Sequence, residues 1–199
     1  ANVHRGLHYL SNQATDRYEA VRGTIQRFLG AAHEDEILFT SGSTMGINLV
    51  SYAWAAPRLQ PGDEIVLSVL EHHANIVPWH FLRERQGVVL KWVEIQPDGS
   101  LDMDSLAKQL SPKTKLLALT HMSNVLGTLT PVRRLADAGH AAGALVLVDG
   151  AQYTPHLATD VAALGADFYG FTGHKMLGPT GVGVLWGRED LLEAMPAFL

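Results

Sequence analysis

The chain has 199 residues, of which 47% are hydrophobic and 18% charged, with a formal net charge of −5 and no cysteine. This composition is sufficient for one well-buried core, gives no support to nucleic-acid binding, and excludes disulfides and thiolate metal sites within the chain. No apolar run approaches the roughly 18 residues of a membrane span, and the first residues do not resemble a signal peptide, so we expect a cytoplasmic protein without membrane association.

The first predicted element is a helix over residues 11–29, with Gly30 as a suitable residue to end it. Apolar residues recur in it at three- and four-residue spacing: Ala14, Tyr18, Val21, Ile25 and Phe28. Before this helix, His4 and Arg5 lie in a polar arm, whose simplest interpretation is exposure to solvent.

A predicted strand over residues 36–40 leads through a small-residue turn into a helix over residues 47–54. A helix start of this kind offers free backbone N–H groups and the positive end of a dipole, which favour an anion such as phosphate. Ser43 and Thr44 in the turn add hydroxyl donors. The alternative is that one of them is an ordinary helix N-cap.

The next strand is predicted over residues 64–69, followed by the pair His72-His73 and a helix around Asn75 that tolerates Pro78 in its first turn. Two adjacent histidines suggest a metal site. However, neighbouring residues on a strand or helix point apart, and no nearby side chains complete a ligand set. We therefore predict no metal site and a structural role for His73.

Two further strands are predicted over residues 88–95 and 115–120, with a helix over residues 101–110 between them that Asp102 caps. Asn124 lies just beyond the second strand, where its amide could simply satisfy the backbone of the loop. Another helix, over residues 132–142, follows.

The apolar run from Leu145 to Val148 ends in Asp149, with a glycine directly after it. Continuous apolar runs of this length are typical of buried parallel strands, and ligands of α/β sheets bind just beyond the carboxyl ends of such strands. An unpaired buried carboxylate is costly. Asp149 is therefore expected to face a cation, a metal ion or several hydrogen-bond donors.

A lysine follows the next predicted strand, residues 167–171. The glycines and the proline around Lys175 predict a tight irregular turn in place of a helix, and residues 182–186 return as an antiparallel strand because the turn is too short for a crossover. Thr172 and His174 flank the amine, which in these apolar, glycine-rich surroundings could act as a nucleophile or base. The alternative is a solvated loop lysine.

Strands alternate with helices from residue 36 to residue 186, which predicts a single α/β domain with a mostly parallel central sheet and helices on both faces. One ligand uses a lysine and an aspartate together. Pyridoxal phosphate forms a Schiff base with a lysine and pairs its ring nitrogen with an aspartate. The sequence therefore predicts that Lys175 and Asp149 bind pyridoxal phosphate.

Five segments of the chain carry a family resemblance: Val3-His4-Arg5-Gly6, residues 71–79 and 123–128, Asp149-Gly150-Ala151-Gln152 and Thr172-Gly173-His174-Lys175. They closely resemble the SufS/CsdA-type (group II) cysteine desulfurases and the related selenocysteine lyases, within the class V aminotransferase-like enzymes of fold-type I. The resemblance covers the whole chain. It implies the cofactor-binding large domain of such an enzyme, with an N-terminal arm and helix over residues 1–30 and a sheet core over residues 36–199.

The resemblance also implies a role for each candidate residue. The cofactor phosphate would be held by Ser43, Thr44, Thr172 and His174, and the ring oxygen by Asn124 and Gln152. His72 would stack on the ring, His4 and Asn124 would lie near the substrate, and the freed amine of Lys175 would remove the Cα proton. Relatives usually carry an arginine and two threonines where this chain has Ser41, Ser43 and Thr44, and a serine at the position of Thr172.

By the same resemblance, the expected reaction converts L-cysteine to L-alanine and transfers sulfur to an enzyme cysteine as a persulfide. That cysteine and the arginine for the substrate carboxylate belong to a C-terminal part that this chain lacks. The chain also starts at Ala1 without a methionine and stops at an apolar end, residues 196–199. We therefore expect a fragment of about half of an enzyme, one that forms a homodimer and passes sulfur to an acceptor protein.

Other functions remain open at this point. A selenocysteine lyase, or an aminotransferase, epimerase or lyase of the same fold, would use the same lysine and aspartate. A nicotinamide-binding domain is disfavoured because no G-x-G-x-x-G follows the first strand. A non-catalytic scaffold would tolerate loss of the Schiff base.

Overall fold

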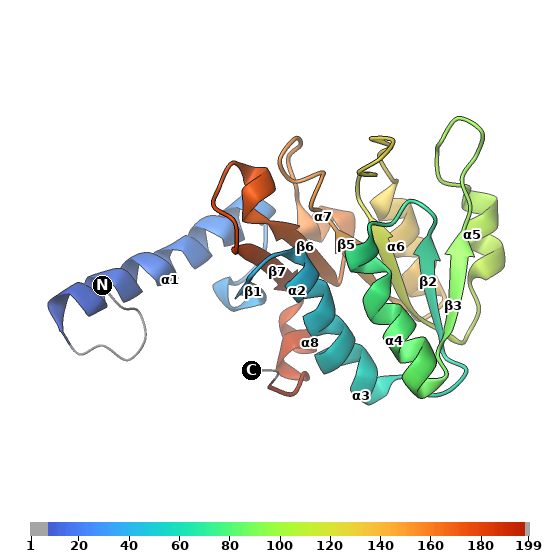
Figure 1. Ribbon diagram of the computed structural model, residues 1–199, viewed down its shortest axis with the longest axis horizontal. Helices are drawn as coiled ribbons and strands as arrows, with labels where there is room; N and C mark the ends of the chain where they lie inside the picture. The colour runs from blue at the N-terminus through green and yellow to red at the C-terminus, as the bar shows by residue number, and fades with distance from the viewer. Residues whose placement is uncertain (1–7, 198–199) are drawn as a thin grey trace.

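A seven-stranded sheet forms the centre of the computed structural model, which describes residues 8–197 (Figure 1). Its order is β1-β7-β6-β5-β4-β2-β3. The strands are β1 (Ile37–Thr40), β2 (Glu64–Ser68), β3 (Val89–Val93), β4 (Thr114–Thr120), β5 (Leu145–Asp149), β6 (Phe168–Thr172) and β7 (Gly183–Gly187).

The strands from β2 to β6 are parallel to one another, whereas β7 is antiparallel to both of its neighbours, β6 and β1. The predicted α/β class, the mostly parallel sheet and the antiparallel last strand are thus confirmed. The sequence did not predict that β1 would pair with β7, the last strand along the chain. That pairing brings the turn after β1 next to the end of β6.

Helices cover both faces of the sheet, as predicted (Figure 1). Side chains alternate between the faces along each strand. Leu117 of β4 belongs to one apolar cluster and the adjacent Leu116 to the other. The first cluster includes residues of α1 (Tyr9–Leu29), α5 (Met103–Gln109), α6 (Val132–Ala141) and α7 (Val161–Leu164). The second includes residues of α2 (Ser43–Leu49), the π-helical turn η2 (Val50–Ala55) and α4 (Val77–Gln86).

The short elements complete the chain. They are η1 (Glu34–Glu36), α3 (Ala56–Arg58), η3 (His73–Asn75), η4 (Gly173–Met176) and α8 (Glu189–Glu193). Local signals placed several helix ends correctly. Gly30 ends α1 in the left-handed conformation, and the Asp102 carboxylate accepts hydrogen bonds from the backbone N–H groups of Asp104 (2.9 Å) and Ser105 (3.1 Å). Pro78 lies in the first turn of α4, where its missing N–H costs little.

Two predicted segments differ from the structure. The helix predicted over residues 47–54 begins earlier, at Ser43, and passes through a π-helical turn before it ends. The predicted irregular turn around Lys175 is wrong in part, because residues 173–176 form the single 3₁₀ turn η4. A 3₁₀ turn needs only i→i+3 bonds, so it fits between the glycines, and the Gly178 N–H then closes it on the Gly173 carbonyl (2.9 Å).

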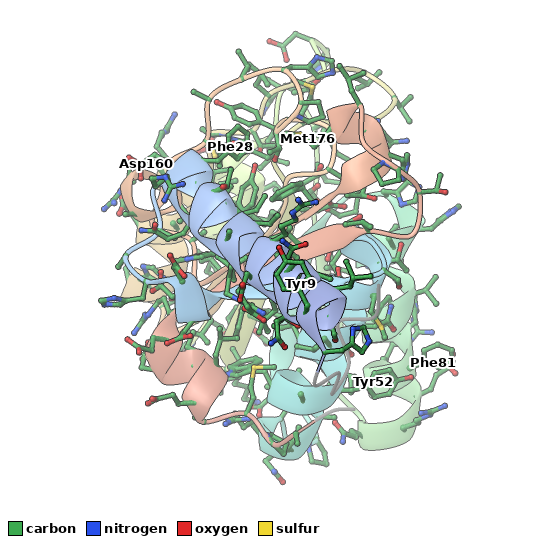
Figure 2. All side chains as sticks on the ribbon, turned by 90° about the vertical axis from the view of Figure 1, so that its left-hand side faces the viewer. Tyr9, Phe28, Tyr52, Phe81, Asp160 and Met176 are labelled. Carbon is green, nitrogen blue, oxygen red and sulfur yellow. The ribbon has the colours of Figure 1, made fainter. Side chains whose placement is uncertain are left out.

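Helix α1 extends away from the rest of the molecule at its N-terminal end (Figure 1). Figure 2 shows it crossing one side of the molecule, with Tyr9 at its start and Phe28 near its end. Phe28 and Met176 line the same apolar groove, between α1 and the segment that carries Lys175. None of the helices between residues 8 and 197 is both long and apolar enough to span a bilayer.

Candidate active site

A cavity of about 200 Å³ lies at the carboxyl edge of the parallel strands. The loops that follow β4, β5 and β6 run along this edge, at the top of Figure 1. The cavity is lined by Ser43, Thr44, His72, Thr120, Met122, Asn124, Asp149, Ala151, Gln152, Thr172, His174 and Lys175. All nine residues predicted to bind the cofactor therefore lie around one cavity. The predicted substrate-proximal residue His4 lies outside the described residues.

Asp149 is the last residue of β5, and its carboxylate is almost fully buried. Burial raises the pKa of this carboxyl, whereas the hydrogen bond from the Ala151 N–H and electrostatic interactions with Lys175 and His72 act to lower that pKa. Among the described residues, Oδ1 accepts one hydrogen bond, from Ala151 N (3.0 Å). The carboxylate can still accept further hydrogen bonds from the cavity side. A buried carboxylate of this kind favours a cationic N–H donor there.

Gly150 explains how the chain can turn directly after Asp149. A Cβ at this position would overlap the ring of Tyr169, which packs under the strand end. The missing side chain leaves room for the fully buried Tyr169 ring next to the end of β5.

Lys175 extends into the cavity from η4, one turn after the end of β6. Strand β6 pairs directly with β5, with Asp149 opposite Gly170. The amine and the carboxylate therefore reach the same cavity from neighbouring strands. The two side chains do not lie on opposite faces of the sheet, an arrangement in which one ligand could not contact both.

The possible phosphate donors come from two segments that β7 brings together. Ser43 and Thr44 form the first turn of α2, while Thr172 ends β6 and its hydroxyl lies 3.0 Å from His174 Nδ1. A Cβ at Gly183 of β7 would overlap the backbone of Gly42, so glycine is required for the two segments to approach. The free N–H groups of the helix start and three hydroxyls then face one cavity.

His72 caps the 3₁₀ turn η3 with its ring. Its Nδ1 accepts a hydrogen bond from the Ala74 N–H (3.1 Å), so the neutral imidazole carries its proton on Nε2. His73 beside it is exposed. Between residues 8 and 197, no group of three or more histidine, aspartate or glutamate side chains is arranged to hold a metal ion.

Asn124 is exposed at the rim of the cavity. The alternative interpretation gave it the task of satisfying the loop backbone, but Ser123 performs that task. The buried Ser123 hydroxyl accepts from the N–H groups of Val125 and Leu126, each at 3.2 Å. The amide of Asn124 is thereby left to face the cavity, as does that of Gln152 from the loop after β5.

Sequence reasoning missed three cavity residues, Thr120, Met122 and Ala151. Each lies at or just beyond the end of β4 or β5, so its place at a strand end was the available signal.

It also missed a polar cluster whose members His121 and Tyr153 directly follow the cavity residues Thr120 and Gln152 in the chain. His121 stacks on Tyr153 with ring centroids 3.4 Å apart, and its Nδ1 lies 3.1 Å from the Tyr169 hydroxyl. That hydroxyl lies 3.1 Å from Thr154 Oγ1. Burial raises the pKa of Tyr169 to about 12. The cluster links β4 and β6 to the loop that carries Gln152, and it has no local sequence signature because its members are far apart in the chain.

Acid should weaken this cluster. Burial lowers the pKa of His121 to about 4, from a usual value of 6.5. The stability that depends on the neutral ring is complete above the unfolded-state pKa and is lost as the pH falls toward the folded-state pKa. Between about pH 7.5 and about pH 5, the cofactor-free protein should lose about 2 kcal/mol of unfolding free energy that His121→Gln does not lose. Chemical denaturation at both pH values measures this, with the exposed His156→Gln as control; equal pH dependence in wild type and His121→Gln would contradict it.

The fold and the cavity together define an α/β domain with a polar cavity at the carboxyl edge of its sheet. The model of the family "Aminotransferase class-V" matches residues 1–199, and the chain belongs to this family.

Within this family, the chain is similar to proteins named cysteine desulfurases. The chain is 52% identical over 196 residues to a probable cysteine desulfurase 1 of Mycobacterium leprae, covering 98% of this chain and 32% of that protein. It is 51% identical over 195 residues to a cysteine desulfurase of Klebsiella pneumoniae, covering 98% and 48%. The crystal structure of the cysteine desulfurase CsdA from Escherichia coli superposes with a TM-score of 0.92 at 44% identity, over 100% of this chain and 50% of that one. The chain thus spans half or less of the length of these relatives.

Proposed function

We propose that the whole protein is a pyridoxal phosphate-dependent cysteine desulfurase and that this chain is the cofactor-binding part of its large domain. The observation that carries the proposal is that Asp149 and Lys175 reach one cavity from neighbouring strands, among hydroxyls and N–H groups suited to a phosphate. The identity to proteins named cysteine desulfurases supports the reaction. A smaller C-terminal domain would complete the protein.

The residues present fit the cofactor. The buried Asp149 carboxylate can accept a further hydrogen bond, which suits a protonated ring nitrogen. The hydroxyl and N–H groups that line the cavity suit a dianionic phosphate; they belong to Ser43, Thr44, Thr172 and His174. When bound, the cofactor supplies an electron sink that stabilises negative charge at the substrate Cα.

The chain's own residues would then act on protons and orientation. Lys175 Nζ, once free, would take the Cα proton of the substrate and return a proton. His72 presents Nε2–H toward the cavity because Nδ1 is occupied by the Ala74 N–H. Asn124 and Gln152 offer amide groups that would orient the ring oxygen.

The sulfur must be accepted outside this chain, because the chain has no cysteine. In the balanced reaction, an enzyme thiol and L-cysteine give L-alanine and an enzyme persulfide. The C–S bond of the substrate breaks, an S–S bond forms, and the thiol proton compensates the proton that the product carbon gains. We also propose, from the family resemblance, a homodimer in the cytoplasm that passes the sulfur to an acceptor protein.

Product analysis tests the proposal. The full-length protein, incubated with pyridoxal phosphate and L-cysteine, should release L-alanine together with an equal amount of persulfide sulfur, which a thiol reductant then releases as sulfide. Formation of pyruvate and ammonia in place of alanine would identify an eliminating lyase and contradict the desulfurase. A parallel assay with L-selenocysteine decides between the desulfurase and the selenocysteine lyase.

A further inference from the structure

A buried carboxyl that the proposed mechanism does not use lies directly before His72. Glu71 is 8% exposed and does not line the cavity. Burial raises the pKa of Glu71 to about 7; hydrogen bonds from Ser68, the Thr120 backbone and Asn75 oppose this rise, and the nearby charge of Asp149 adds to it. A buried carboxyl costs free energy that an apolar side chain of similar size would not. Its contacts indicate what it does there.

Those contacts join four elements. The Ser68 hydroxyl at the end of β2 donates to Glu71 Oε1, and Asn75 Nδ2 of η3 donates to Oε2 (2.7 Å). The Trp79 Nε1–H of α4 in turn donates to Asn75 Oδ1 (3.1 Å). Asn75, Ser68 and Trp79 are fully buried, and a backbone contact with Thr120 adds β4. The carboxyl therefore fixes the path of the chain between β2 and α4.

His72 lies within this path but has little support of its own. Its ring is exposed toward the cavity, and the described structure gives it one hydrogen bond, from the Ala74 N–H. The position of the ring thus depends on the backbone between Glu71 and Asn75, whose two side chains bond to each other. Any loosening of that backbone moves the imidazole relative to Asp149 and Lys175 across the cavity.

We infer that Glu71 is a positioning residue, whose hydrogen bonds to Ser68 and Asn75 hold the His72 imidazole against the ring of the cofactor. The inference rests on the proposed function, since it needs pyridoxal phosphate in the cavity. It assigns to Glu71 no contact with the cofactor or the substrate. The inference is that its effect on cofactor binding passes through His72, and not through the charge of Asp149 or the backbone of Thr120, which also interact with Glu71.

A double-mutant cycle on the affinity of the full-length protein for pyridoxal phosphate tests this route. Glu71→Ala should weaken binding by roughly 10- to 100-fold. This is the range typical of metal sites when a residue that hydrogen-bonds to a metal ligand is removed. In the His72→Ala background the same substitution should change the dissociation constant less than about twofold, because the ring to be positioned is gone. The visible circular dichroism of the bound cofactor should change in Glu71→Ala and be restored in Glu71→Gln, whose amide can still accept from Asn75 and donate to Ser68.

The controls separate the possible failures. Glu94→Ala, at an exposed glutamate, should leave the affinity unchanged. If Glu71→Ala does not fold, Ser68→Ala replaces it in the cycle, with a smaller loss of about threefold and the same dependence on His72. Equal losses in both backgrounds, or no loss from Glu71→Ala, would overturn the inference. Absence of Lys175-dependent cofactor binding in the wild type would instead overturn the proposed function.

Discussion

Replacing Lys175 by alanine is expected to abolish the covalent capture of pyridoxal phosphate and to lower desulfuration by at least about 10³-fold, or about 4 kcal/mol of transition-state stabilisation. Lys175 is the lysine that lines the cavity. The substitution removes both the amine that would bind the cofactor and the base that would take the Cα proton. An absorption spectrum of the full-length protein after incubation with pyridoxal phosphate measures the first loss, and alanine release from L-cysteine the second.

The exposed Lys108 provides a matched control, because Lys108→Ala removes the same charge far from the carboxyl edge of the sheet. That variant should keep both the visible band and the activity. A visible band that survives unchanged in Lys175→Ala would exclude this lysine as the attachment point. Wild-type protein that never develops the band would exclude the cofactor itself.

Asp149→Asn should be nearly as damaging to activity, with an expected fall in kcat on the order of 10³-fold. The asparagine keeps an oxygen that can accept from Ala151 N–H, so the loop after β5 should hold its shape. A neutral amide, however, cannot stabilise a positively charged ring nitrogen. Steady-state kinetics with L-cysteine at saturating pyridoxal phosphate measure the effect, and unchanged kcat would contradict the proposed ring contact.

Although Asp149→Asn should lower activity, it should raise the stability of the cofactor-free protein. Burial raises the pKa of Asp149, so the cofactor-free wild type loses stability as the pH rises from the unfolded-state value through the folded-state value. Without cofactor, Asp149→Asn lacks this loss and should be more stable than wild type near neutral pH. Denaturant titration measures the difference, and the exposed Asp35→Asn, which should shift nothing, is its control.

Sequence reasoning predicted the residues that line the cavity better than the buried polar residues that hold them in place. Asp149 and Thr172 could be placed because a residue at the carboxyl end of a parallel strand faces the ligand edge whatever the rest of the fold does. His121 and Glu71 could not, because their roles depend on partners in other elements, such as Tyr169 of β6 for His121 and Asn75 of η3 for Glu71. Buried polar clusters follow from three-dimensional packing, which local periodicity does not encode.

The same distinction explains the errors in the elements. The alternation of strands and helices was readable from apolar runs, whereas the π-helical turn at residues 50–55 and the 3₁₀ turn at Lys175 were not. Both depend on how a short segment fits between packed neighbours. The pairing of β1 with β7 could not be predicted either, because the sequence of a short apolar strand does not specify which strand it will pair with.

That partner has a consequence for how the protein is made. In the described sheet, β1 is an edge strand whose neighbour is β7, the last strand along the chain. During synthesis, residues 37–40 have no sheet partner until residues 183–187 have left the ribosome. A nascent chain halted before that point would expose an open strand edge prone to aggregation, and β7 would not yet hold the turn after β1 next to the end of β6.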